Sequence, residues 1–185
     1  VSSHTVAGGP ATELFAARGD YVDLVDITPD GQRVLFRSDR GNADFDFDLY
    51  SVPIGGGNAV RLNPPLGAGR TVEAFTMSPD GATVAYRADQ NADEVFEMFT
   101  VPTAGGSPRR VSAPLVADGD VENRADFAPD STWLTYVADG NTDGVIELYG
   151  VDLASGAVAR LSPNERAIQQ LGFSLRGLLS GALAV

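Results

Sequence analysis

A short motif divides the chain into three similar units. Pro-Asp-Gly begins at Pro29 and at Pro79, and Pro-Asp-Ser begins at Pro129, so the three copies lie 50 residues apart. The residues that follow each copy align with one another, at 33–39, 83–89 and 133–139. Two further segments of each unit also align, at 49–53, 98–102 and 148–152 and at 60–63, 109–112 and 159–162. Agreement at four landmarks indicates an internal repeat.

Each unit is expected to form four short strands. The first strand is predicted to end at Ile27, Met77 or Phe127, where the Pro-Asp-Gly motif turns the chain. β-branched and aromatic residues fill the second strand, and a turn rich in glycine separates the third strand from the fourth. Four antiparallel strands in a repeat of roughly 40 to 50 residues are typical of a propeller blade. The sequence therefore predicts an all-β fold, a β-propeller built of four-stranded antiparallel blades.

The repeat also predicts how the chain is divided. We expect residues 1–185 to form a single propeller or a part of one, with full blades at 15–62, 63–111 and 112–162. Residues 1–14 resemble the closing strands of a blade. Residues 163–185 resemble the degenerate start of a further blade, and a helical or non-native tail is the alternative. If both ends are half-blades, they would together complete a fourth blade, within one chain or between two.

The segment 75–86 carries a resemblance to a known family. Its residues, Phe-Thr-Met-Ser-Pro-Asp-Gly-Ala-Thr-Val-Ala-Tyr, resemble the repeat of TolB-like proteins and of the propeller domains of prolyl-oligopeptidase relatives. The resemblance covers roughly residues 20–162. It implies a β-propeller that acts as a binding platform in the bacterial envelope or outside the cell. Because only three full units are present, it implies a partial propeller here.

Acidic residues gather in the connection between the second and third strands. In the third unit, oxygen-bearing side chains occupy alternating positions around a glycine, an order that can wrap a loop around a hard cation. The candidate calcium ligands there are Asp139, Asn141, Asp143 and Glu147, and in the second unit they are Asp89, Asn91, Asp93 and Glu97. An inserted residue breaks this spacing in the first unit, at Asp39, Gly41, Asp44, Asp46 and Asp48. The second and third loops look like the calcium-binding hairpin loops of integrin-type propellers, so we expect calcium to stabilise the fold through them.

Simpler explanations compete with a functional role for the repeated residues. Asp, Asn and Gly are favoured in any solvated hairpin, so the acidic loops need no metal. Asp30, Asp80 and Asp130 are expected to bond the backbone of their own turns. The aromatic residues that recur in register are expected to pack between blades: Phe36, Tyr50, Tyr86, Phe99, Tyr136 and Tyr149. Arg61, Arg110 and Arg160 are expected to carry edge charges or salt bridges, which protect outer strands against edge pairing.

Composition excludes several functions. The 13 basic and 25 acidic residues give a net charge of −12, which argues against a nucleic-acid partner because phosphate contacts need clustered Lys and Arg. No apolar run is long enough for a membrane helix, so no membrane insertion is expected. There is no cysteine, and the single histidine, His4, stands beside no recognisable catalytic partner. Without a Gly-x-Ser-x-Gly motif either, the sequence predicts that this is not an enzyme.

The leading hypothesis is a non-catalytic propeller that binds a protein, peptide or glycan. The connections between blades, 63–74 and 112–125, differ most between units and are the expected specificity loops. The alternative is an accessory propeller of a prolyl-oligopeptidase-like serine peptidase. Because an open stack would leave sheet faces in water, we expect a homo-oligomer, most simply a dimer, or a small closed ring. The resemblance implies a periplasmic or secreted protein.

Overall fold

Three four-stranded sheets form most of the described part of the chain, and each corresponds to one sequence unit. The computed structural model describes residues 2–3, 12–14, 21–39 and 46–162. Blade 1 contains β3 (Val22–Ile27), β4 (Arg33–Ser38), β5 (Asp48–Pro53) and β6 (Val60–Arg61). Blade 2 contains β7 (Val72–Met77), β8 (Thr83–Ala92), β9 (Val95–Pro102) and β10 (Arg109–Arg110). Blade 3 contains β11 (Val121–Phe127), β12 (Trp133–Ala138), β13 (Glu147–Asp152) and β14 (Val158–Arg160).

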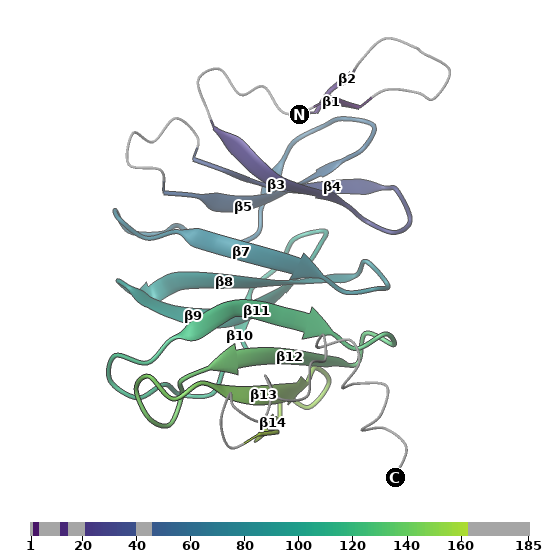
Figure 1. The fold of residues 1–185 in the computed structure, drawn as a ribbon. Helices are drawn as coiled ribbons and strands as arrows, with labels where there is room; N and C mark the ends of the chain where they lie inside the picture. The colour runs from purple at the N-terminus through teal and green to yellow at the C-terminus, as the bar shows by residue number, and fades with distance from the viewer. Residues whose placement is uncertain (1, 4–11, 15–20, 40–45, 163–185) are drawn as a thin grey trace.

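Every blade is an antiparallel meander with its strands in sequence order. The three sheets stack face to face, with blade 2 between blades 1 and 3 (Figure 1). The first strands end at Ile27, Met77 and Phe127, as the repeat predicts. These observations confirm the all-β fold and the four-stranded antiparallel blades of a propeller. We call β3, β7 and β11 the inner strands.

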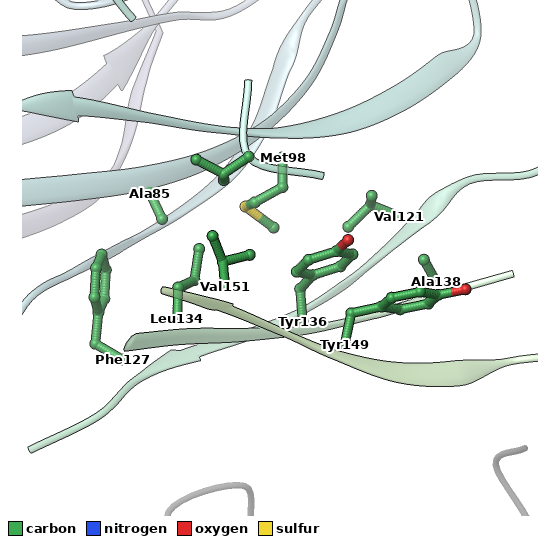
Figure 2. Packing of buried hydrophobic residues seen from close by; sticks show 10 residues of the cluster. Ala85, Met98, Val121, Phe127, Leu134, Tyr136, Ala138, Tyr149 and Val151 are labelled. Atoms are coloured by element: carbon green, nitrogen blue, oxygen red, sulfur yellow. The ribbon is translucent and has the colours of Figure 1, made fainter. Parts of the chain in front are cut away.

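Apolar side chains fill the space between neighbouring blades. Between blades 1 and 2, Leu35 and Leu49 meet Val84 and Tyr86. Between blades 2 and 3, Ala85 and Met98 contact a cluster that includes Leu134, Tyr136 and Val151 (Figure 2). In blade 2, one face of the sheet therefore packs on blade 1 and the other face on blade 3. The alternation of side chains along each strand produces this division.

The recurring aromatic residues form one stacked pair in each blade. The ring centroids of the pairs lie 5.7, 5.3 and 5.2 Å apart, in Phe36–Tyr50, Tyr86–Phe99 and Tyr136–Tyr149. All six rings are buried, which confirms the predicted packing role. Burial raises the pKa of the Tyr136 hydroxyl to about 12, so this hydroxyl is neutral and accepts a hydrogen bond from the Ala113 backbone N–H.

Arginines tie blades 1 and 2 to the blade that follows. Arg37 donates to the carbonyl oxygen of Val72 at 2.9 Å and lies 4.6 Å from the centroid of the Phe47 ring. Arg87 occupies the same place one unit later, donating to the Val121 carbonyl oxygen and lying 3.8 Å from the centroid of Phe96. Each contact combines a charge-assisted hydrogen bond with a cation–π contact. These arginines therefore fix the following inner strand against the preceding blade.

The Pro-Asp-Gly turns are closed by their own aspartates. Asp30 Oδ1 accepts hydrogen bonds from the Thr28 hydroxyl and the Gln32 N–H, and Asp80 makes the equivalent bonds with Ser78 and Ala82. Asp130 Oδ1 accepts both the N–H and the hydroxyl of Thr132. The side-chain bond to Thr28 is the main reason why the pKa of Asp30 is lowered, and bonds to Ser78 and Thr132 likewise lower those of Asp80 and Asp130. The predicted structural role of these aspartates is confirmed.

The structure describes only a few residues at the N-terminal end of the chain and none after residue 162. β1 (Ser2–Ser3) and β2 (Thr12–Glu13) pair antiparallel, and Leu14 is buried against Phe36 and Tyr50. This contact fits a closing strand before blade 1, although the predicted half-blade over residues 1–14 stays a prediction. The predicted degenerate blade start at residues 163–185 lies outside the described residues. Within the described residues, no helix has the length and apolar character needed to cross a membrane.

Candidate functional site

In the third acidic hairpin, protein groups surround the predicted calcium ligands. The Asn141 side-chain amide donates to Glu147 Oε2 at 2.6 Å, and Arg160 donates to Glu147 Oε1 at 2.6 Å. Burial opposes ionisation of Glu147, but bonds from Tyr149, Asn141 and Arg160 outweigh it and lower the pKa of this carboxyl. Asn141, Tyr149 and Arg160 therefore form one hydrogen-bonded network around the buried Glu147 carboxylate, with Asn141 and Arg160 themselves exposed.

Asp139 and Asp143 differ from Glu147 in what they contact. Asp139 is buried and accepts backbone hydrogen bonds from Asp120 at 2.5 Å and from Gly144 at 3.0 Å. Asp143 is exposed. The structure thus brings Asn141 and Glu147 into contact and uses Asp139 to join the hairpin to the start of β11.

The second acidic hairpin repeats this arrangement. Asn91 donates to Glu97 Oε2 at 2.5 Å, and Arg110 donates to Glu97 Oε1 at 2.6 Å. Asp89 accepts the Thr71 N–H at 2.7 Å, whereas Asp93 is exposed. The salt bridges of Arg110 and Arg160, together with that of Arg61 to Asp48 at 3.3 Å, confirm the predicted ion pairs at the outer strands.

The first acidic hairpin is described only in part, because residues 40–45 lie outside the described residues and include the candidates Gly41 and Asp44. Asp46 accepts the Gly69 N–H at 2.9 Å, and Asp48 accepts the Asn63 amide at 2.6 Å. Among the described residues, no three carboxylate or imidazole groups converge into a set that could hold a metal ion. Calcium binding at the second and third hairpins stays a prediction, and a bound ion would have to replace protein partners there.

The connections between blades, predicted as specificity loops, are held down by the blades. Leu66 packs into the cluster between blades 1 and 2, and Leu115 packs into the next cluster. Arg70 donates to the Gln90 carbonyl oxygen at 3.2 Å, and the Val116 N–H donates to Gly140 at 3.1 Å. These connections lie beside the acidic hairpins, at one end of the blades, and much of their surface is used for contacts within the molecule.

A cavity opens at the other end of the blades, where the Pro-Asp-Gly turns lie. It has a volume of about 550 Å³ and is lined by equivalent residues of all three inner strands and their turns, which are Asp26, Ile27, Pro29, Thr76, Met77, Ser78, Pro79, Asp126, Phe127 and Pro129. We call it the axial cavity. Residues of all three described blades contribute to this single cavity, so it is our candidate site.

A second cavity continues from the axial cavity between blades 2 and 3. Its volume is about 230 Å³, and Thr76 and Asp126 line both cavities. Arg87, Arg124 and Glu122 line this inner cavity. Burial lowers the pKa of Arg87, and the nearby carboxylates, Asp120 first, oppose that shift. The lining therefore changes from acidic and apolar at the mouth to mixed charge farther in.

Irregularities in the inner strands shape the surface around both cavities. The pairing of each inner strand with the second strand shifts once, between Asp23 and Asp26, between Val72 and Ala74, and between Val121 and Ala125. In blade 1 this bulge includes Leu24, which has a φ of 44° and is 48% exposed. Bulges re-aim side chains and occur beside binding sites more often than elsewhere. In β3, Leu24 and Val25 are exposed.

The residues of the axial cavity were not singled out as a site by the sequence reasoning above. The repeat itself could have identified these residues. Asp26, Thr76 and Asp126 lie 50 residues apart, and each stands immediately before the last residue of its inner strand. Inner strands of neighbouring blades converge on the propeller axis, so equivalent positions on them share one space. The acidic residues favoured the hairpins instead, although the buried carboxylates there already have protein partners.

Comparisons with known protein structures identify the fold. No family model matches the chain, and no curated protein matches its sequence. Solved structures do match, among them a protein assigned as TolB from Agrobacterium tumefaciens, 23% identical with a TM-score of 0.55 over 79% of this chain and 47% of that chain. TolB from Acinetobacter baumannii is 19% identical, with a TM-score of 0.54 over 85% of this chain and 36% of that one.

The structure of a peptidase also matches this chain, with a similar TM-score. A puromycin-hydrolysing peptidase from Mycobacterium tuberculosis is 13% identical, with a TM-score of 0.58 over 84% of this chain and 23% of that chain. The chain thus spans less than half the length of each of these three structures. Identities this low show the fold alone. Taken with the three four-stranded blades, they show that the described residues have the TolB-like β-propeller fold and form part of such a propeller.

Proposed function

We propose that this chain is a non-catalytic propeller module that binds a partner at the axial cavity, in the periplasm or outside the cell. The supporting observation is the cavity of about 550 Å³ to which all three blades contribute. Of the partners considered, a protein, a peptide or a glycan, an extended peptide fits best. Apolar side chains such as Ile27, Met77 and Phe127 line the cavity, and Ile27 is 51% exposed.

The rigidity of the lining supports a binding role. The inner strands are held by arginine contacts between blades and by turns that their own aspartates close. A preformed surface loses little conformational freedom when a partner binds, so more of the contact energy appears as affinity. Binding sites on strands of a scaffold are also positioned more accurately than sites on loops.

A selection experiment tests this proposal. Peptides displayed on phage are selected on the immobilised chain and then compared on two variants, Thr76→Trp and Val158→Trp. Thr76 lines both cavities, so a tryptophan there fills the site, whereas Val158 is exposed on the outer strand β14. The proposal predicts enriched peptides that lose binding to the first variant and keep it on the second. Failure to enrich any peptide, or equal binding to both variants, would contradict it.

We further propose that blade 3 packs against another sheet, through self-association or closure of a small ring. Leu161 is 52% exposed, whereas its equivalents Leu62 and Val111 are 1% and 4% exposed between blades. Burying an apolar side chain of this size contributes about 1.5 to 3 kcal/mol. Light scattering tests this, with a dimer or a compact closed monomer expected. A monomer with the hydrodynamic radius of an open stack would contradict both forms.

The alternative function is an accessory propeller of a prolyl-oligopeptidase-like serine peptidase. It is favoured by the similarity to a puromycin-hydrolysing peptidase, which matches as well as the TolB structures do. In that case the axial cavity would lie on the path of a substrate toward a separate hydrolase domain. The complete gene decides between the two functions, because a hydrolase domain encoded beside the blades would support the alternative.

A further inference from the structure

We propose that the inner cavity, between blades 2 and 3, is a pocket for one phenylalanine side chain of the bound peptide. This inference rests on the proposed binding function and names the residue that anchors the partner. The rest of the peptide lies in the axial cavity, which shares Thr76 and Asp126 with the inner cavity.

Two small residues from neighbouring blades line this pocket. Ala85 of β8 belongs to the apolar cluster between blades 2 and 3, and Ala125 of β11 packs against the same cluster. Both alanines line the inner cavity, together with Met98. Ala85 and Met98 project from blade 2 toward blade 3 (Figure 2). The cavity therefore lies where the two blades meet with short side chains.

The equivalent space between blades 1 and 2 is filled. The repeat places Leu35 at the position of Ala85 and Phe75 at the position of Ala125, 50 residues earlier in each case. Leu35 is buried in the cluster between blades 1 and 2, and Phe75 packs against that cluster. A leucine and a phenylalanine thus occupy the space that two alanines leave open one blade later. The first interface therefore indicates which side chain the second interface accepts.

The size and lining of the pocket agree with an aromatic ring. The inner cavity has a volume of about 230 Å³. A cavity of about 150 Å³ lined by Leu, Ile and Phe takes up benzene in an engineered protein. Apolar side chains that could contact a ring line the pocket here, and they are Ala74, Phe75, Ala85, Met98 and Ala125. A buried ring would remove apolar surface of both partners from water.

The charged groups of the lining offset one another, so they do not favour a charged occupant. Arg87 donates to the Val121 carbonyl oxygen and forms a salt bridge with Glu73. Glu122 and Arg124 are exposed and bring opposite charges to the lining. These groups suit the polar backbone of a peptide, whereas the apolar part of the lining suits its side chain.

Contacts at both ends of β11 hold the two walls of the pocket. At the start of this strand, the Val121 carbonyl oxygen accepts a hydrogen bond from Arg87 of blade 2. In the turn after the strand, the Ser131 hydroxyl accepts the Asp80 N–H at 3.1 Å. The blades therefore need not separate when a side chain enters, and a preformed pocket loses little free energy to reorganisation.

Peptide selection identifies the anchor. A phage library of random seven-residue peptides is selected on the immobilised chain, and each enriched peptide is then synthesised with phenylalanine and with alanine at its anchor position. We expect the enriched peptides to share a phenylalanine, and the alanine form to bind about 10-fold more weakly, near the lower end of the effect of burying such a side chain. Enriched peptides without a shared phenylalanine, or equal binding of both forms, would overturn this inference and leave the proposed function standing. Failure to enrich any peptide would overturn both.

Two variants locate the pocket. Ala125→Phe supplies the side chain that Phe75 supplies one blade earlier, so we expect it to melt like the unaltered chain and to bind the phenylalanine and alanine peptides equally. Ala159→Phe makes the same change at an exposed position of the outer strand β14 and should keep the 10-fold preference. A folded Ala125→Phe variant that keeps the preference would overturn the inference.

A measurement on the unaltered chain covers the case in which the variant does not fold. Nuclear Overhauser effects are recorded between the ring protons of the bound peptide's phenylalanine and the methyl groups of the chain. We expect contacts with the methyl groups of Ala85, Met98 and Ala125. Contacts with Ile27 of the axial cavity in place of these three would put the ring outside the pocket and overturn the inference.

Discussion

The two ends of the blades use carboxylates in opposite ways. At the acidic-hairpin end, buried Asp89, Glu97, Asp139 and Glu147 each have protein partners, so the carboxylates hold the hairpins and the inner strands in place. At the Pro-Asp-Gly end, one aspartate of each turn is used locally, and Asp26 and Asp126 line a cavity.

This difference shows that acidic density alone does not locate a binding site. The end with more carboxylates satisfies them internally, because each buried charge needs a partner to offset its loss of hydration. At the end with fewer carboxylates, Asp26 and Asp126 line an open, partly apolar space. The predictions below test each side of this comparison.

The largest expected effect is the loss of a buried carboxylate at the acidic-hairpin end. Glu147→Ala leaves the Asn141 amide, the Tyr149 hydroxyl and the Arg160 guanidinium without their shared acceptor. We expect a loss of about 3 kcal/mol in the free energy of unfolding, measured by urea denaturation. Asp143→Ala, at an exposed position of the same hairpin, is the control and should change it by less than about 0.5 kcal/mol. Equal effects would remove the distinction between the buried Glu147 carboxylate and the exposed part of the loop.

The packing of one Pro-Asp-Gly turn on the next gives the second effect. Gly81 has a φ of 72°, and an added Cβ would lie 2.7 Å from Pro29 Cδ. Gly31 has a φ of 67° but nothing lies within 4 Å of an added Cβ. Gly81→Ala should therefore cost about 2 to 3 kcal/mol, from backbone strain and overpacking, and Gly31→Ala about 1 kcal/mol from strain alone. Thermal or urea unfolding measures both, and matching costs would show that the turns are not packed together.

Acid should remove the stabilisation that the ionised turn aspartates give to the folded protein. Because the pKa values of Asp30, Asp80 and Asp130 are lowered below 3.8 by folding, their ionised forms stabilise the protein at pH values above 3.8. This contribution is lost as the pH falls through the lower folded values. A triple Asn variant keeps an acceptor in each turn but has no charge to lose. The gap in urea midpoint between wild type and variant should shrink below pH 3.8, and a constant gap would contradict this account.

Calcium should give the smallest effect. If the second and third hairpins bind it as their spacing predicts, the melting temperature rises in calcium relative to chelator, and Asp93→Asn with Asp143→Asn reduces the rise. The rise should be small, because an ion must replace Arg110 or Arg160 at Glu97 or Glu147. An unchanged melting temperature would contradict calcium binding.

Much of the fold was predictable because local chemistry repeats with the unit. The Pro-Asp-Gly turns, the stacked aromatic pairs and the arginine salt bridges each follow from residues close in sequence or in register. The contacts between blades were harder to foresee. Arg37 reaches the Val72 carbonyl, 35 residues away, and the third unit has Val137 at that position. The axial cavity depends on three strands meeting, so no single unit reveals it.

The most direct test maps the amide chemical shifts of the chain by NMR while a peptide selected on the immobilised chain is added. The account predicts that the shifts concentrate on the ends of the inner strands and on the Pro-Asp-Gly turns, around Asp26, Thr76 and Asp126, and leave the hairpins at 89–97 and 139–147 unchanged. Shifts that concentrate on those hairpins instead would contradict the assignment of binding to the Pro-Asp-Gly end.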